Sequence, residues 1–531
     1  MRSTAFAAAL LVMSGLPAFS QHDHAGMSGH TDQLGKVSFA NSCSPAAQPD
    51  FLRGVAMLHS FWYSAGEQAF RAALASDPGC VIADWGIAAI LMNNALAGVG
   101  ATAGDEVKAR AALDNARSVG ARTERERDYV EAVAAYYKDF GQHTERERQI
   151  ARSAAYEALA AKYPDDDEAR IFSALYIAGT QAQSDQTYAA YARATTILEP
   201  MFRKYPNHPG VAHYLIHAYD APPLAARGLE AARAYSKIAP DAPHAQHMPS
   251  HIFTRVGAWE ESAASNAHAF AAALPGREFG ESQHASDYMV YADLQLARDD
   301  AAKAAIDQAM AIDIPALAPP SYYARSAMPA RYAVERGDWR SAANLAVMTG
   351  GPPYTEALSR FARAIGAART GDDKAADAEA AQLQKLQEKL AFIGNVYWAS
   401  EVEVQRIAAT AWASFARGET ATALAAMRAA ADREDGQEKH ITTPGRLLPA
   451  RELLGDMLME AGQPNAALVE YEQSFRRDPN RFRGLYGAAR AAEAAGEPTK
   501  QKEYAQKLID LTSTADTARP EIVWARAVSR K

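Results

Sequence analysis

Prolines that recur at a nearly constant spacing limit most strongly how this chain can fold. Pro206, Pro240 and Pro275 lie 34 and 35 residues apart, and each follows a segment with apolar residues at helical spacing. Proline lacks the backbone N–H that a continuing helix needs, so each of these prolines ends a helix. Strand signals, such as alternating valine, isoleucine and threonine, are nearly absent. A pair of helices cannot bury its apolar face alone, so units of this length must stack on one another.

A glycine stands between the two helices of several units and is followed by small residues. Gly257, Gly337 and Gly462 are examples, and each precedes an alanine-containing segment. This pattern resembles the tetratricopeptide repeat (TPR), a helix–turn–helix unit of 34 residues. The resemblance implies an all-α fold, a TPR-like α-solenoid of stacked helix–turn–helix units. The clearest units cover about 51–78, 209–240, 241–275, 281–314, 320–350, 400–434 and 446–479.

Longer sequence stretches resemble exported bacterial tetratricopeptide repeat proteins in particular. They are LHSFWY at 58–63, DPGC at 77–80, DWG at 84–86, HMPSHIF at 247–253 and PGRLLPARELLG at 444–455. The resemblance spans most of the chain beyond residue 20. It implies the fold and assigns no activity.

The composition is that of a folded protein with no bias toward polyanionic partners. Of 531 residues, 48% are hydrophobic and 22% charged, which excludes a mostly disordered chain. The formal net charge of -8 gives no reason to expect nucleic acid or anionic lipid as a partner. The expected partner is a protein or peptide, as for other tetratricopeptide arrays. Two cysteines cannot form an all-cysteine zinc site or an iron–sulfur cluster.

The first residues have the pattern of a secretory signal peptide. Arg2 precedes an apolar run from Thr4 to Leu16, and small residues lead up to a cleavage site after Ser20. The alternative, a membrane anchor, needs a longer run. We therefore expect export, most simply to a bacterial periplasm, and no membrane span in the mature chain.

Export makes a disulfide between Cys43 and Cys80 the expected state of the two cysteines. An oxidising compartment favours pairing, and two cysteines leave no odd thiol. The alternative is two separately buried thiols, because sequence cannot show whether their Cα atoms are close.

These patterns divide the chain into segments. We expect a signal peptide at 1–20, a flexible histidine-rich segment at 21–40 and irregular helical repeats at 41–205. Central repeats with a histidine cluster follow at 206–350. The C-terminal repeats with a capping helix occupy 351–515, and a tail occupies 516–531. His22, His24 and His30 in the second segment could bind copper or zinc loosely or form a solvated tail.

Histidines gather in the central repeats. His213 and His217 lie four residues apart on one predicted helix with Asp220 three residues beyond, and His247 and His251 repeat the spacing in the next unit. First helices of stacked units lie side by side, so these stripes converge, and His284 joins them from the unit after. Such a set suits a Zn, Cu or Fe ion. The alternative is a set of polar core residues hydrogen-bonded between helices.

Other residues are candidates for binding an organic ligand. Lys439, His440 and Arg451 lie in or after a long polar connection and could bind a carboxylate or phosphate, unless Arg451 pairs with Glu434 or Asp435. The remaining candidates on predicted helices and turns are His59, Trp62, His244 and Arg255.

Two functions follow from these patterns. The first is an exported scaffold that binds a protein, a peptide or a small ligand in a concave groove. The second is a metal-dependent enzyme or metal-handling protein that uses the histidine cluster on the same fold.

Overall fold

The computed structural model describes residues 33–98 and 100–530, so the predicted signal peptide and most of the histidine-rich segment lie outside the described residues. Gln33–Lys531 form one compact unit. Every regular element in the described part is a helix, which confirms the all-α prediction. The same residues include no helix that combines the length and the apolar character required to span a bilayer.

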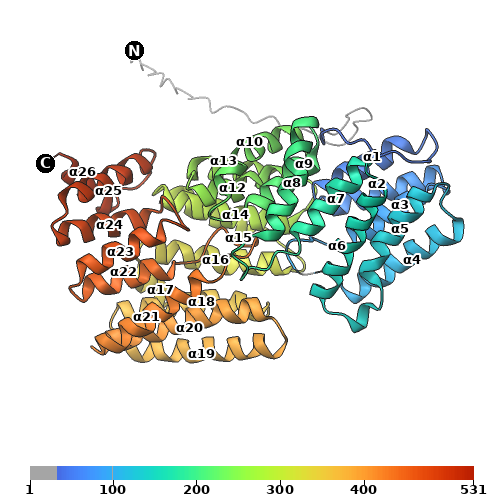
Figure 1. The fold of residues 1–531 in the computed structure, drawn as a ribbon. Coiled ribbons are helices and arrows are strands. Elements are labelled where there is room, and N and C mark those ends of the chain that lie inside the picture. The colour runs from blue at the N-terminus through green and yellow to red at the C-terminus, as the bar shows by residue number, and fades with distance from the viewer. Residues whose placement is uncertain (1–32, 99, 531) are drawn as a thin grey trace, which may run out of the picture. The chain divides into compact units, whose positions relative to one another are not determined.

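Helices that are consecutive in the chain pack on one another as hairpins, and each hairpin packs on the next (Figure 1). The N-terminal helices are α1 (Gln48–His59), α2 (Tyr63–Ser76), α3 (Ile82–Ile90), α4 (Ala103–Val119), α5 (Glu124–Tyr137), α6 (Glu145–Lys162), α7 (Asp167–Ala178) and α8 (Ala189–Lys204). A short 3-10 turn, η1 (Phe140–Gln142), separates α5 from α6. Thr102 and Thr144 cap α4 and α6 through reciprocal bonds with Asp105 and Glu147.

The central helices contain the predicted repeat units. They are α9 (Pro209–Tyr219), η2 (Ala225–Gly228), α10 (Leu229–Ile238), α11 (Pro243–His247), α12 (Pro249–Val256), α13 (Trp259–Ala273), α14 (Phe279–Gln295), α15 (Asp299–Ala311), α16 (Pro319–Glu335) and α17 (Trp339–Ala343). Pro249 begins α12, so the first helix of the unit at 241–275 is divided in two. A proline in the first turn sacrifices no helical hydrogen bond, which explains the break.

The C-terminal helices continue the same pattern. They are α18 (Pro353–Arg369), α19 (Asp373–Phe392), α20 (Val396–Ala416), α21 (Thr420–Asp435), α22 (Ala450–Glu460), α23 (Pro464–Ser474), α24 (Phe482–Ala495), α25 (Pro498–Leu511) and α26 (Pro520–Ser529). The arrangement as a whole is a TPR-like stack of helix–turn–helix units.

The two ends of the predicted division differ from expectation in the described residues. Helix α26 lies within the expected tail at 516–531, because Arg519 pairs with buried Asp299 and Ile522 is buried after it. At the other end, residues 33–40 of the segment expected to be flexible have no regular secondary structure, but Leu34 and Phe39 are buried.

Repeats that are far apart in sequence also contact each other. In a simple solenoid each unit touches only its neighbours. Gly257 ends α12 with a positive φ of 71°, and an added Cβ there would lie 2.6 Å from Cβ of Asn480. The indole N–H of Trp259 donates to the Asn480 carbonyl oxygen at 2.6 Å. The C-terminal repeats therefore pack back on the central ones.

The predicted disulfide is confirmed. Cys43 and Cys80 are joined, and their Cα atoms lie 4.6 Å apart. The bond ties the segment before α1 to the start of α3.

Candidate metal centre

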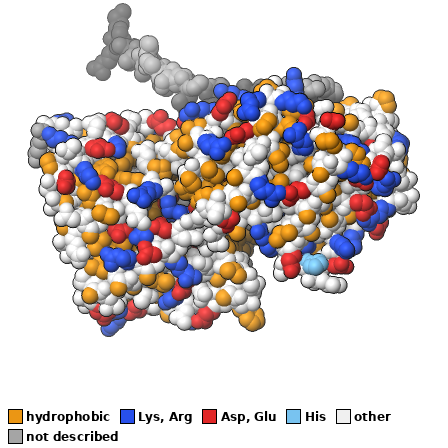
Figure 2. All heavy atoms as spheres, in the orientation of Figure 1, with side chains coloured by type: hydrophobic (Ala, Val, Ile, Leu, Met, Phe, Trp, Pro, Cys, Tyr) orange, Lys and Arg blue, Asp and Glu red, His pale blue; other side chains and the backbone are white. Residues whose placement is uncertain are grey.

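Six histidines from consecutive central units meet inside the helical stack. His284 is half-buried and the other five are buried. They come from α9 (His213, His217), α11 (His244, His247), α12 (His251) and α14 (His284). The face shown in Figure 2 carries interspersed acidic and basic side chains and almost no histidine, as this burial requires. The stripes predicted from helical spacing thus do converge.

The six side chains form two groups of three. One ring nitrogen from each of His247, His251 and His284 lies within 4.8 Å of the other two, and we call this the 247 group. His213, His217 and His244 satisfy the same criterion and form the 213 group. The groups adjoin, since the ring centroids of His244 and His247 are 5.9 Å apart.

In the 247 group, the outer nitrogens of two rings already have acceptors. Nδ1 of His247 lies 2.7 Å from Oδ1 of Asn266, and Nδ1 of His251 lies 2.9 Å from Oδ2 of Asp220. The amide of Asn266 is oriented, because its Nδ2 donates to the Ser262 carbonyl oxygen at 2.7 Å. Both Nδ1 atoms must therefore carry the hydrogen and donate it.

The inner nitrogens of these two rings then face each other. Nε2 of His247 lies 3.0 Å from Nε2 of His251. With both Nδ1 atoms protonated, two neutral rings present two lone pairs to each other and need a cation between them, a proton or a metal ion. Two imidazoles on one tetrahedral zinc at about 2.0–2.1 Å have nitrogens ~3.3 Å apart. The spacing found here is close to that value.

Two rings of the 213 group have the same polarity. Nδ1 of His213 donates to the carbonyl oxygen of His59 at 2.7 Å, and Nδ1 of His244 lies 3.0 Å from Oε2 of Glu281. Nε2 of His213 and Nε2 of His217 are 3.0 Å apart, while Nε2 of His244 is buried without a hydrogen-bond partner. Outer acceptors on Nδ1, as on His213 and His244, are usual for metal-binding histidines, whereas Nε2 of His217 can donate to Nε2 of His213.

Asp220 supports the cluster from outside the two groups. One carboxylate oxygen faces His251, and the other accepts from Nε of Arg255 at 2.7 Å. Lys439 Nζ lies 3.4 Å from Oδ2. Burial opposes ionisation of Asp220, but Lys439 and Arg255 outweigh it and hold its pKa well below the usual range. The sequence placed Asp220 among the metal ligands, whereas here it orients His251.

Burial disfavours the charged form of most of these histidines. Burial lowers the pKa of His213, His217 and His247 well below the usual value, and the neighbouring imidazoles lower it further. Burial also lowers the pKa of His251, against the opposing effect of Asp220, and that of His284 to about 3. Neutral imidazole is the form that binds metal.

The long polar connection after α21 lies over the cluster. The hydroxyl oxygen of Tyr288 lies 3.2 Å and 3.1 Å from the carbonyl oxygens of Ile441 and Thr443, which share its one hydrogen. The Tyr288 ring centroid is 4.7 Å from that of His247. Burial lowers the pKa of Lys439, in the same connection, to about 8, although Asp220 raises it. A segment that is 153 residues from Tyr288 and 219 residues from Asp220 in sequence thereby covers the site.

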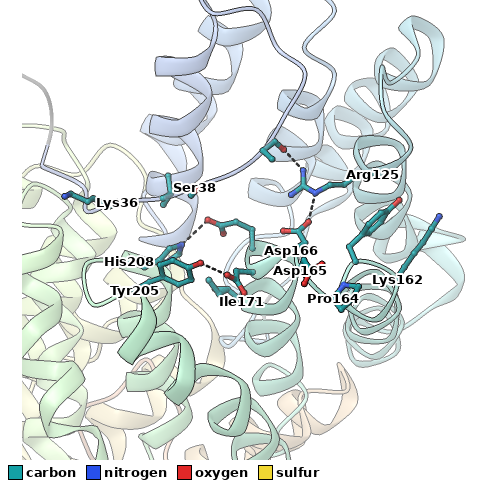
Figure 3. Close-up of a pocket in the computed structure, with 15 residues that line it drawn as sticks. Lys36, Ser38, Arg125, Lys162, Pro164, Asp165, Asp166, Ile171, Tyr205 and His208 are labelled. Carbon is teal, nitrogen blue, oxygen red and sulfur yellow. Dashed lines mark hydrogen bonds and ion pairs between the residues drawn. The ribbon is translucent and has the colours of Figure 1, made fainter.

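A third group of possible ligands has a different character. Glu168 lies 2.9 Å from Nε2 of His59 and 3.0 Å from Nε2 of His208. The remaining nitrogens are also taken, by the Tyr214 hydroxyl on His59 and the Val211 N–H on His208. Every ring nitrogen has a protein partner, so this group is a buried polar network. It borders a surface pocket of about 670 Å³ that is also lined by Lys36, Arg125 and Tyr205 (Figure 3).

The other predicted ligand-binding residues have protein partners. The Trp62 indole donates to Glu278 at 3.1 Å, and His440 contacts the Ala97 carbonyl oxygen at 3.2 Å. Arg451 binds the carboxylates of Asp432, Asp435 and Glu470 at 2.5, 2.8 and 2.8 Å. This fits the alternative in which Arg451 pairs with Asp435. The structure brings Arg255, Lys439 and His244 to the cluster, but not Arg451.

Sequence analysis missed Asn266 and Tyr288, which orient and cover the 247 group. Asn266 lies on α13, which packs on α11, and Tyr288 follows His284 by one helical turn. The spacing of Tyr288 from His284 was a usable signal. Nothing in the sequence marks Asn266.

The fold and these side chains define a class: an all-α helical-repeat protein with a buried cluster of histidines.

No protein-family model and no curated sequence matches the chain. Among solved structures, the Cut9 and Hcn1 hetero-tetramer of the APC/C is similar over 92% of this chain and 77% of that one, with 11% identity and a TM-score of 0.35. Yeast Tom70 is similar over 91% and 96%, with 12% identity and a TM-score of 0.30. Human IFIT1, solved with m7Gppp-AAAA, is similar over 86% and 95%, with 12% identity and a TM-score of 0.32. Likeness at this level carries no argument about function.

Proposed function

We propose that this chain is a metal-binding helical-repeat protein that holds Zn, Cu or Fe ions in the 247 group and the 213 group. The observation that carries the proposal is the pair of Nε2 atoms of His247 and His251, 3.0 Å apart with both Nδ1 atoms already donating. A hydrogen bond between two neutral rings does not satisfy that arrangement, and a shared metal ion does.

The donor set indicates the class of metal. Three imidazoles with no cysteine suit zinc, copper or iron better than calcium or magnesium, which prefer oxygen ligands. Three protein ligands leave a coordination position for water or a substrate, as in catalytic zinc sites. The site thus suits either a metal-dependent enzyme or a metal-handling protein.

The test is metal stoichiometry in single and double variants. Purified protein is loaded separately with Zn²⁺, Cu²⁺ or Fe²⁺, freed of excess ion and analysed for metal per chain. We expect wild type to retain up to two ions, His251→Ala to lose the ion of the 247 group and His217→Ala to lose that of the 213 group. The double variant should retain none.

Two matched controls remove a histidine elsewhere. His143 is exposed, and His208 belongs to the polar network with Glu168. Neither His143→Ala nor His208→Ala should change the stoichiometry. Wild-type protein that retains none of the three ions would overturn the proposal, and so would a double variant that retains as much metal as wild type.

The predictions of a binding scaffold and of export stay predictions. Repeat stacking is common among protein-binding arrays, which is an analogy of fold. The Cys43–Cys80 disulfide supports an oxidising compartment. N-terminal sequencing of the protein secreted by its source cell, with a new N-terminus at Gln21 expected, tests export.

A further inference from the structure

Arg152 on α6 is a fully buried cation without a buried anion. Its exposed fraction is 0%, and among the described residues no carboxylate accepts a hydrogen bond from its Nε or Nη2. Within the described residues, its one hydrogen bond runs from Nη1 to the sulfur of Met92 at 3.7 Å. An isolated buried charge costs several kcal/mol, so proteins pair or solvate such charges.

The other two largest fully buried arginines show how this chain treats a buried guanidinium. Arg331 binds Asp287 at 2.8 Å, and Arg481 binds Glu335 and Glu452 at 2.8 and 2.7 Å. Arg152 has the same burial and lacks the carboxylate. The contrast indicates that its partner comes from outside the described residues.

The unpaired atoms of Arg152 are Nε and Nη2. These two N–H groups point the same way from one edge of the planar guanidinium, and together they form the fork that binds both oxygens of a carboxylate or phosphate. Nη1, at the opposite corner, is the atom that contacts Met92. The free edge is thus the edge suited to two-point binding of an oxyanion.

Tyrosine rings pack against the guanidinium of Arg152. The guanidinium carbon lies 4.4 Å from the ring centroid of Tyr176 and 5.2 Å from that of Tyr136, so aromatic faces hold the cation. Its positive charge also acts on the hydroxyls of Tyr137 and Tyr156, opposing the burial that raises their pKa values. These contacts stabilise the cation and leave its Nε–Nη2 edge without a protein partner among the described residues.

We infer that the Nε–Nη2 edge of Arg152 is a binding site for the carboxylate or phosphate group of a small ligand. The site stands apart from the histidine cluster and does not depend on the proposed metal binding. The two N–H donors fit a carboxylate and a phosphate equally well. An experiment therefore has to separate a carboxylate ligand from a phosphate ligand.

The experiment compares anion-dependent unfolding temperatures of the full-length protein. The probes are sodium phosphate, sodium acetate and sodium benzoate, titrated at constant ionic strength against sodium chloride. We expect a saturable rise for wild type with at least one probe, and calorimetric titration with that probe gives its Kd. A rise with phosphate alone assigns a phosphate ligand, and a rise with acetate or benzoate alone assigns a carboxylate.

The variants isolate the fork. Arg152→Lys keeps the charge and loses the paired donors, so affinity should fall at least 10-fold, and Arg152→Met should abolish the saturable rise. Arg146, exposed on the same helix, is the matched control, and Arg146→Met should behave as wild type. If Arg152→Met does not fold, the affinity of Arg152→Lys for the probe tests the inference.

Two outcomes would overturn the inference. One is an Arg152→Lys variant with wild-type affinity. The other is wild-type protein that shows no saturable rise with any probe and whose native mass is that of the chain alone, without a bound ligand.

Discussion

Oδ2 of Asp220 lies 2.9 Å from Nδ1 of His251, and the same carboxylate holds Arg255 and Lys439. This bond fixes which nitrogen of His251 carries the hydrogen and leaves Nε2 facing His247. Asp220 therefore contacts both Lys439, in the long polar connection, and His251, whose orientation in the 247 group it fixes.

Asp220→Asn should weaken metal binding by about 10–100-fold, the usual cost of losing a partner that orients a ligand histidine. Asp287 is a buried carboxylate in the next unit that pairs with Arg331, and Asp287→Asn is the control for a general loss of stability. Competition with a metal indicator measures both affinities. Equal affinity in Asp220→Asn and wild type would contradict the assigned role of Asp220.

Metal should stabilise the folded chain, because the two groups exist only when α9, α11, α12 and α14 are assembled. Binding to the folded state alone adds about 2.7 kcal/mol to the free energy of unfolding at a free metal concentration of 100 Kd. Thermal unfolding with and without a chelator measures the difference. The His217→Ala, His251→Ala double variant should show the same unfolding temperature in both conditions.

Removing the disulfide should destabilise the protein. The bond between Cys43 and Cys80 closes a loop with a sequence separation of 37 residues. Loss of this constraint on the unfolded chain costs about 3–4 kcal/mol in the entropy model. Urea unfolding of a Cys43→Ser, Cys80→Ser variant against oxidised wild type measures it. Labelling of both thiols in wild type without reductant would contradict the bond itself.

Asp293 should make stability depend on pH. Burial raises its pKa from 3.8 to about 7, against the opposing effect of Arg298. Between these values the folded state keeps a proton that the unfolded state has lost, so the free energy of unfolding falls as pH rises from about 4 to about 7. Asp293→Asn should remove a few kcal/mol of this dependence. Urea unfolding of both proteins at pH 4.5 and 7.5 tests this prediction. An equal change in the free energy of unfolding between the two pH values in wild type and Asp293→Asn would refute it.

Local sequence signals were enough for the helices and for the histidine stripes. Pro206, Pro240 and Gly257 end helices through their own backbone chemistry, so the repeat boundaries follow from residues next to them. The spacing of His213 from His217 likewise places both on one face of a single helix. Helix α26 was missed because the Arg519–Asp299 pair that anchors it joins residues 220 positions apart.

The partners of the histidines could not be predicted in this way. Asn266 orients His247 from another helix, and Lys439 reaches Asp220 from a connection 219 residues away. Arg146, which is exposed, and Arg148, which is half-buried, precede Arg152 in α6, and no neighbour in sequence reveals that Arg152 is buried without a carboxylate partner among the described residues.

Helix ends and helical faces depend on residues within a few positions of each other, so an all-α chain of paired helices and the faces that carry its histidines follow from local sequence. Only the packing of distant helices makes the inner nitrogens of His247 and His251 face each other and brings Asp220 and Asn266 to their outer nitrogens. The same packing leaves Arg152 without a carboxylate partner among the described residues. Those relationships depend on how helices far apart in the chain pack, and burial gives them their energetic weight.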